Sequence, residues 1–248
     1  MGKPVSIVAF WLSYRGENFH GYQAQGELRT VQSEVLRAFQ EAGLPRNPVV
    51  GGRTDKGVSA RMQVLSARVE AGTSLDDVRA RLNASLPEDI RVELIKPAGE
   101  RFHAAWSSSG KIYRYTLAPD AALSIDALRT AAAIFPGTHN FKTFHFKTSE
   151  ERLRTVRSID VSPRDDGSLV LTFSGDGFAR HMVRMLTGAM LGFARAKFSE
   201  QTLREALTTQ ANFYCPVADP EPLTLWEVLY PPEVDPFTSA ERATRLTD

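Results

Sequence analysis

Cysteine is nearly absent from the sequence, since Cys215 is the only one among 248 residues. A single cysteine cannot form a disulfide within the chain, and a chain of this size without disulfides is typical of a reducing compartment. The histidines offer no pair at the spacing of zinc ligands, so we expect no structural metal. These absences favour a cytoplasmic protein that depends on its hydrophobic core for stability.

Long hydrophobic runs are also missing. The most apolar stretch, Met182 to Ala194, is interrupted by Arg184 and is shorter than the roughly 20 residues that span a membrane. The apolar run Val5 to Leu12 has no small-residue cleavage site, so we expect a first strand there and not a signal peptide. Hydrophobic residues make up 42% and charged residues 24% of the chain, as in ordinary globular proteins. The composition therefore predicts a globular protein that does not associate with a membrane.

The chain has no large excess of charge of either sign, because its formal net charge is only +1. The strongly basic balance that is typical of nucleic-acid-binding proteins is absent. Lysine is scarce, with 7 among the 30 basic residues, so that 23 are arginines. Arginine suits bidentate phosphate contacts and stacking on bases, although a GC-rich genome would produce the same bias. Composition alone leaves a nucleic-acid partner open.

The first half of the chain alternates strand and helix patterns. Runs of β-branched and aromatic residues predict strands, and capped segments with apolar residues at helical spacing predict helices. In order, we expect a strand at Val5 to Tyr14, a helix capped by Thr30 and stopped by Gly43, strands at Pro48 to Val50 and Gln63 to Val69, a helix opened by Ser74 with Asp77 and running to about Leu86, and a strand at Ile90 to Ile95. This βαββαβ order is that of the ferredoxin-like unit.

The second half is built from similar parts. In order, we expect a strand at Lys111 to Leu117, a helix from Ser124 to about Phe135, a hairpin of Thr155 to Val161 with Leu169 to Phe173, a long helix from Phe178 to about Lys197 with Arg180, Arg184 and Arg195 along one face, a helix at Glu200 to Leu207, and a strand at Leu223 to Leu229. The proline-rich tail after Pro231 is expected to be loose. We predict an α+β fold with two ferredoxin-like, RRM-like sheet domains, residues 1–105 and 106–248, that meet at a central cleft.

A glycine-rich loop, Gly51 to Ala60, lies between two of the predicted strands. In a phosphate-binding P-loop, the last glycine is followed by lysine and then by serine or threonine, whereas here Gly57 is followed by valine. What remains is one carboxylate, Asp55, between the cations Arg53 and Lys56. An isolated aspartate in such a turn most often bonds its own backbone. A catalytic carboxylate is the alternative, and it requires other segments to agree.

Other segments do agree, in one order along nearly the whole chain. They are Tyr14 to Gln32 with its glycines and glutamines, Gly52 to Asp55 with Gly57, Val58 and Ala60, Phe102 to Ala104 with Ser107 and Tyr113 to Tyr115, and Phe178 with His181 to Arg184 and Gly188. In this order they resemble the TruA-type tRNA pseudouridine synthases. The sequence departs from the family pattern at Tyr22, where tryptophan is usual, and at Ser59, where histidine is usual. The connection from Ala118 to Arg129 is also shorter than in bacterial members.

The resemblance implies isomerisation of uridine to pseudouridine in tRNA, at positions 38–40 of the anticodon stem-loop. Asp55 would act as nucleophile or as base, Arg184 would pair with it and keep it ionised, and Tyr113 would stack on the flipped base. Arg53, Arg114 and Arg180 would contact the substrate, together with Tyr113. Arg53 would either hold the phosphate of the flipped nucleotide or occupy the space that this nucleotide leaves. The resemblance implies no cofactor and no metal. It further implies a homodimer in which the first domain carries the aspartate loop and the second completes the RNA-binding cleft.

Each of these residues also has a simpler interpretation. A tyrosine such as Tyr113 is more often part of strand packing, and an arginine such as Arg184 is most often on a solvated helix face. Three basic segments are interleaved with Phe102, Trp106 and Phe178, and they could line an RNA groove or form ordinary surface. They contain Arg101, Lys111 and Arg114 in the first, Arg152, Arg154 and Arg157 in the second, and the run from Arg180 to Lys197 in the third. Two functional alternatives also stay open, a non-catalytic RNA-binding protein on the same scaffold and a pseudouridine synthase that acts on a different RNA.

Overall fold

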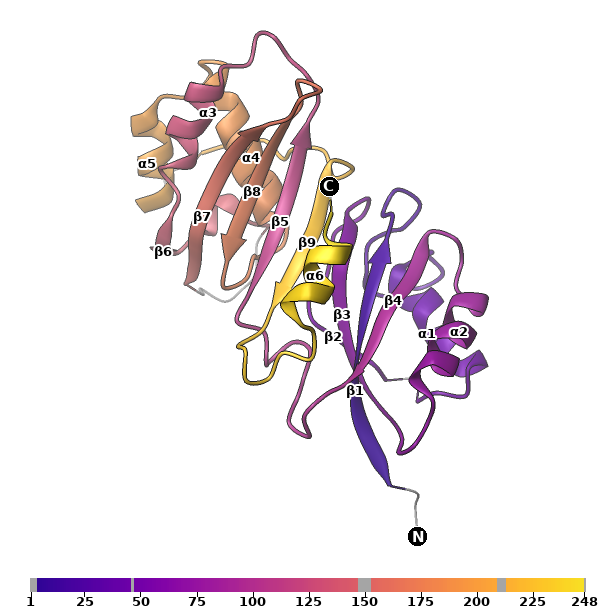
Figure 1. The fold of residues 1–248 in the computed structure, drawn as a ribbon. Helices are drawn as coiled ribbons and strands as arrows, with labels where there is room; N and C mark the ends of the chain where they lie inside the picture. The colour runs from indigo at the N-terminus through magenta and orange to yellow at the C-terminus, as the bar shows by residue number, and fades with distance from the viewer. Residues whose placement is uncertain (1–3, 46, 147–152, 209–212, 248) are drawn as a thin grey trace. The chain divides into compact units, whose positions relative to one another are not determined.

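The computed structural model describes residues 4–45, 47–146, 153–208 and 213–247. The chain forms two compact units, the first made of Met1–Ser109 with Leu225–Asp248 and the second of Gly110–Thr224 (Figure 1). Both units combine helices with an antiparallel sheet, so the expected α+β class is confirmed. The first unit also contains residues 225–248, which the sequence-based division placed with the second half.

The first unit follows the expected βαββαβ order. Its elements are β1 (Val5–Tyr14), α1 (Val31–Glu41), β2 (Val49–Val50), β3 (Ser59–Glu70), α2 (Leu75–Ser85) and β4 (Ile90–Pro97). After the second unit, it also includes β9 (Leu223–Leu229) from Leu225 onward and α6 (Ser239–Arg245). Strand β1 pairs antiparallel with both β3 and β4, and β2 pairs with β3. The chain from Leu225 onward places β9 beside β3.

Helix α1 shows why the local sequence predicted this part of the fold well. The Thr30 side chain accepts a hydrogen bond from the Ser33 backbone N–H, and the Ser33 hydroxyl oxygen accepts one from the Thr30 N–H. This capping box satisfies N–H groups that have no partner within the helix. The apolar face of the helix is buried, with the Phe39 ring 5.2 Å from the ring of Phe10 on β1.

Residues 232–247 have a defined structure that packs on the first unit, so the expectation of a loose tail is wrong. Thr238 and Glu241 form a capping box that starts α6. The ring of Phe237 packs edge-on against Trp11, at 5.5 Å between centroids. Since Phe10 faces α1 and successive strand residues point to opposite faces, Trp11 and Phe237 lie on the other face of the sheet. The C-terminal segment therefore covers the face of the first unit's sheet opposite α1.

Ion pairs hold the C-terminal segment in place. The Arg242 guanidinium lies 2.6 Å from both the Glu227 and the Asp235 carboxylates. Lys96 of β4 lies 2.6 Å from Glu241. The Arg242 pairs are mostly buried, and such pairs are costly to break because a partner is left uncompensated.

The second unit contains β5 (Gly110–Leu117), α3 (Ile125–Ala132), β6 (Gly137–His139), the 3₁₀ turn η1 (Lys142–Phe144), β7 (Arg154–Pro163), β8 (Leu169–Gly175), α4 (Met182–Ala194) and α5 (Glu200–Thr208). Its strands are antiparallel in the order β5-β8-β7-β6. The predicted hairpin of β7 and β8 is confirmed. Neither β6 nor η1 was predicted.

Two helices of this unit are shorter than expected. Helix α3 ends at Ala132, three residues before Phe135. Helix α4 begins at Met182 because His181 has a φ of 61°, a left-handed conformation that the helix cannot include. Arg180 therefore precedes the helix, and the prediction that it lies on a helical face with Arg184 is wrong. Arg195 likewise follows the last helical residue.

Candidate active site

The loop between β2 and β3, residues 51–58, is anchored by the side chain of Gln63 on β3. The Gln63 Oε1 atom accepts hydrogen bonds from the Gly52 and Val64 backbone N–H groups, at 3.1 and 3.2 Å. Its Nε2 atom donates to the Gly52 carbonyl oxygen. Gln63 is fully buried, so these bonds replace the water that its amide would otherwise bind. The sequence analysis did not identify Gln63 as part of the site.

A buried pair of hydroxyls anchors the next turn of the loop. The Thr54 side-chain oxygen lies 2.8 Å from the hydroxyl of Tyr14 at the end of β1. Burial raises the pKa of Tyr14 to about 12, against the smaller opposing effect of its hydrogen bonds with Thr54 and Gln63. The tyrosine therefore remains a neutral hydroxyl at physiological pH. The Thr54 side chain is therefore fixed in the interior, whereas its neighbour Arg53 is exposed and Asp55 is half-buried.

The segment after β1 packs directly on this loop. The Tyr22 N–H donates to the Thr54 carbonyl at 3.0 Å, and the Gly57 N–H donates to the Phe19 carbonyl at 3.2 Å. Gly21 has a φ of +92°, and a Cβ at Gly16 would lie 2.2 Å from the Val58 carbonyl oxygen. Glycine is therefore required at both positions, which explains why this segment carries glycines opposite the loop.

The two departures from the family pattern have structural roles here. Tyr22 is buried, and burial raises the pKa of its hydroxyl far above the ordinary value. The Ser59 hydroxyl accepts a hydrogen bond from the Gly16 N–H at 3.0 Å. Both side chains thus contact the protein around the loop.

Asp55 is half-buried, whereas Arg53 and Lys56 on either side are exposed. The Asp55 carbonyl accepts a hydrogen bond from the Val58 N–H at 3.1 Å, which closes a tight turn. Gly57 within this turn has a φ of +81°, a value that glycine adopts without strain. Hydrogen bonds therefore fix the backbone of the loop, in which the Asp55 carboxylate lies in sequence between the cations Arg53 and Lys56.

Tyr113 and Tyr115 lie on β5 of the second unit, and both are buried. Alternation along the strand places them on one face, as expected, with half-buried Arg114 on the other. The Phe178 ring packs edge-on against Tyr113, with 5.4 Å between centroids. Tyr113 is therefore fixed by an aromatic neighbour that the sequence analysis also singled out.

Arg184 is half-buried on α4 and is held by the chain that leads to β9. Its Nε atom donates to the Ala218 carbonyl at 2.7 Å, and the Ala218 N–H donates to the Arg184 carbonyl at 3.1 Å. Burial raises the pKa of the nearby Tyr115 to about 12, with Arg184 opposing this shift. Arg184 is therefore not on a freely solvated helix face.

Arg180 is exposed just before α4. Its guanidinium lies 5.6 Å from the centroid of the Phe146 ring, and the Phe146 N–H donates to the Arg180 carbonyl at 3.0 Å. The predicted substrate-contacting arginines thus come from three different elements, Arg53 from the β2–β3 loop, Arg114 from β5 and Arg180 from the segment before α4.

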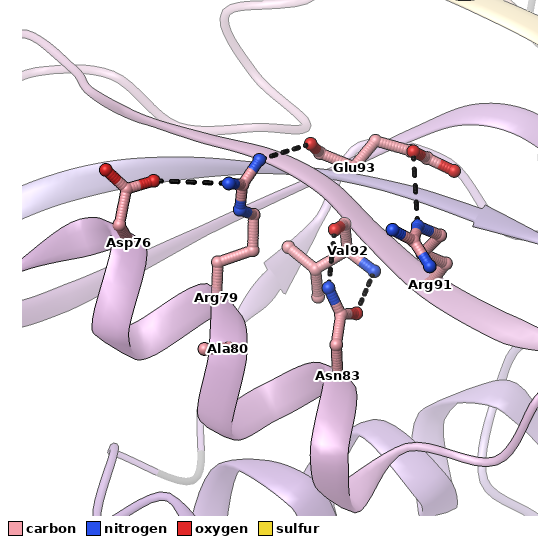
Figure 2. A pocket seen from close by; sticks show the side chains of 7 residues that line it. All are labelled: Asp76, Arg79, Ala80, Asn83, Arg91, Val92 and Glu93. Carbon is pink, nitrogen blue, oxygen red and sulfur yellow. Dashed lines mark hydrogen bonds and ion pairs between the residues drawn. The ribbon is translucent and has the colours of Figure 1, made fainter.

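A cavity of about 260 Å³ lies between α2 and β4 and is lined by none of the predicted site residues. Figure 2 shows that its polar side chains are engaged with one another and with the backbone. Asp76 pairs with Arg79, and Asn83 bonds both the N–H and the carbonyl of Val92. This cavity is part of the helix–sheet packing.

Among the described residues, no group of three or more His, Cys, Asp or Glu side chains could hold a metal ion. Within the same part of the chain, no helix is long and apolar enough to cross a membrane.

Comparison with known proteins agrees with the motif order. Residues 131–231 match a family model described as tRNA pseudouridine synthase. The tRNA pseudouridine synthase A of Listeria welshimeri is 32% identical over 240 residues, which cover 88% of this chain and 97% of that protein. The Geobacillus kaustophilus enzyme of the same name is 35% identical over 243 residues, covering 90% and 93%. That of Pyrococcus furiosus is 30% identical over 230 residues, covering 90% and 83%. The chain therefore belongs to the tRNA pseudouridine synthase A family.

Proposed function

We propose that this protein isomerises uridine to pseudouridine in tRNA, at positions 38–40 of the anticodon stem-loop, with Asp55 as the catalytic residue. The observation that carries the proposal is the rigid mounting of Asp55. Gln63, Thr54 and two glycine contacts fix the backbone of its loop, while the carboxylate is half-buried between exposed Arg53 and Lys56. Family membership supplies the reaction and the substrate class.

The chemistry suits a single carboxylate. The bond between N1 of the base and C1′ of the ribose breaks, the base turns, and C1′ joins C5, after which the C5 proton is lost and N1 is protonated. No electron leaves or enters, so the isomerisation calls for no redox cofactor. Asp55 acts either as a nucleophile that forms a temporary covalent bond or as a base that takes the 2′ proton.

The remaining roles follow from side-chain chemistry. Arg184 is proposed to pair with Asp55, and Tyr113 to stack on the target base once it has left the helix of RNA, a step that costs a few kcal/mol. Arg53, Arg114 and Arg180 are proposed to contact RNA phosphates, because guanidinium groups bind phosphate in bidentate geometry. Asp55, Arg53, Tyr113, Arg114 and Arg184 support these assignments because they lie in segments that resemble the family motifs. Exposed Arg180 lies between Phe178 and His181 of the last segment.

The proposal extends to assembly and location. With a net charge of only +1, one chain is a weak partner for a polyanion, so we propose a homodimer with a shared RNA groove, located in the cytoplasm. We also propose that both units are ferredoxin-like domains.

Sedimentation at micromolar concentration tests the proposed dimer, which should be present under these conditions. Dilution to monomer should weaken tRNA binding in proportion to the loss of dimer. A monomer with full affinity would refute the shared groove.

Pseudouridine mapping in a strain that lacks this gene tests the function. We expect loss of pseudouridine at positions 38–40 of tRNA, and its return when the wild-type gene is restored. Restoration with Asp55→Asn should leave the positions unmodified, whereas Asp76→Asn, an exposed aspartate of the same unit, should restore them. If pseudouridine is lost only from an RNA other than tRNA, the protein is a pseudouridine synthase that acts on that RNA. An unchanged pseudouridine map would favour a non-catalytic RNA-binding protein.

A further inference from the structure

The three aromatic residues that interleave with basic segments have different environments. Phe102 is buried, and Phe178 packs against Tyr113. Trp106 is 85% exposed, which is unusual for the largest apolar side chain. Of the other two tryptophans, Trp11 lies in the core and Trp226 is half-buried with the Arg61 guanidinium over its ring. Trp106 is therefore the aromatic residue whose exposure the fold of the first unit does not explain.

The Trp106 indole is fixed in place although it is exposed. It stacks on the His103 ring with 4.1 Å between centroids and 10° between planes. The Trp106 backbone N–H donates to the His103 Nδ1 atom at 3.1 Å, which sets the orientation of the imidazole. The His103 N–H donates to the Ser107 hydroxyl at 3.1 Å, and the Ser107 N–H donates to the His103 carbonyl at 2.9 Å. One face of the indole is covered by this stack.

The loop that carries Trp106 is anchored beside the aspartate loop. The Ala104 N–H donates to the Ser66 hydroxyl at 3.0 Å, and the Ala104 carbonyl accepts from the Tyr230 hydroxyl at 2.7 Å. A Cβ at Gly51, the first residue of the aspartate loop, would lie only 3.2 Å from the Ala104 carbonyl oxygen. The two loops therefore share one rigid base within the first unit.

The same two loops carry cations without partners. Arg53 and Arg101 are exposed, and neither makes a hydrogen bond or an ion pair with any described residue. Arg101 immediately precedes buried Phe102, which anchors this loop against Tyr230 with 5.0 Å between the rings. A flat aromatic surface with free guanidinium groups on the same loops suits a ligand that combines bases with phosphates. A protein partner would instead favour a wider apolar surface with its charges depleted.

We propose that the uncovered face of Trp106 is a stacking platform for an unpaired base that flanks the target uridine of the RNA. The proposal rests on the proposed function, since it assigns a second nucleotide contact to the same substrate. The His103 stack holds the indole in one orientation before RNA arrives. The base adds to this stack, and Arg101 binds a neighbouring phosphate. The platform therefore acts in substrate binding and in the register of the RNA.

The test compares three variants for binding to a purified tRNA substrate and to its isolated anticodon stem-loop. Trp106→Ala should weaken binding about 5- to 150-fold, the range that corresponds to loss of one base–aromatic stack. The loss should appear in KM more than in kcat. Trp106→Phe, which keeps a ring, should restore most of the affinity. Tyr214→Ala removes an aromatic side chain that is 90% exposed in the second unit, and it is the matched control with unchanged binding.

Intrinsic fluorescence provides a second readout. Adding the stem-loop to an Asp55→Asn enzyme should quench tryptophan emission, and most of this quenching should disappear when Trp106→Phe is added. Wild-type affinity in Trp106→Ala overturns the proposal, as does a Trp106→Phe variant as weak as Trp106→Ala. A loss of self-association with unchanged RNA affinity also overturns it and assigns Trp106 to a protein contact. Binding of RNA without pseudouridine formation by the wild type would contradict the proposed function and leave the platform standing.

Discussion

The hydroxyl groups of Tyr14 and Thr54 lie 2.8 Å apart in the interior of the first unit. Thr54 immediately precedes Asp55, so this contact sets where the aspartate loop leaves the protein. Burial raises the pKa of Tyr14 to about 12, which keeps the group neutral and able to donate a hydrogen bond. The position of the proposed catalytic carboxylate thus depends on a contact with the end of β1, forty residues away in sequence.

The two hydroxyls should be energetically coupled. Tyr14→Phe leaves the Thr54 oxygen without this partner in a buried site, and we expect a loss of about 1–3 kcal/mol in the free energy of unfolding. Thr54→Val should cost a similar amount, and the double variant should cost less than the sum of the two. Urea denaturation of all four proteins measures this cycle. Additive losses would show that the contact does not contribute.

Acid should loosen the C-terminal segment through Glu241. Burial alone would raise the pKa of this carboxyl, but hydrogen bonds from Lys96 and Thr238 outweigh that effect and lower the pKa below the ordinary 4.5. Because the folded pKa is the lower one, the stabilisation is present above pH 4.5 and is lost as pH falls through the folded value. The unfolding free energy should therefore fall more steeply with acid in the wild type than in Glu241→Gln. Parallel curves would contradict this assignment.

Gly188 of α4 should not tolerate even a methyl group. A Cβ there would lie 2.0 Å from the Pro216 carbonyl oxygen, which is backbone and cannot rotate away. We expect Gly188→Ala to lower the free energy of unfolding by about 1–3 kcal/mol, despite the better helix propensity of alanine. Gly99→Ala is the control, because nothing lies within 4 Å of its added Cβ. Equal stabilities of the two variants would show that α4 can move away from Pro216.

Arg184 should require its guanidinium group as well as its charge. Its Nε atom donates a hydrogen bond to the Ala218 carbonyl at 2.7 Å, which fixes the plane of the guanidinium group. A lysine has one donor centre and cannot keep both this bond and a second, fixed interaction. We expect Arg184→Lys to slow single-turnover pseudouridine formation strongly while tRNA affinity stays near the wild-type value. A normal rate in Arg184→Lys would assign Arg184 to packing alone.

Local sequence signals predicted most elements because the signals and the structures are themselves local. Thr30 caps α1, and the apolar runs at Val5–Tyr14 and Leu223–Leu229 form strands with those bounds. The missed helix α6 also had a local signal, the Thr238 and Glu241 capping pair, which the prolines before it obscured. The early start expected for α4 failed because the left-handed backbone at His181 depends on its surroundings.

The supports of the site could not be predicted in the same way. Gln63 reads as an ordinary residue of a strand, and only pairing of β3 with its neighbours brings its amide to the Gly52 backbone. Tyr14 similarly meets Thr54 through the return of the chain after α1. The exposure of Trp106 and its stack on His103 likewise depend on the path of the loop, which the sequence pattern does not predict. Motif order therefore predicts which residues belong to the site, whereas tertiary contacts determine how they are held.

The rate of a single turnover by Asp55→Asn on purified tRNA tests the central claim most directly. Asparagine is close in size to aspartate but is neither a nucleophile nor a base, so the chemical step should disappear. The dissociation constant for tRNA, measured in the same preparation, should stay close to that of the wild type, which shows that the variant is folded. Pseudouridine formation at the wild-type rate by Asp55→Asn would contradict the assignment of the reaction to this carboxylate.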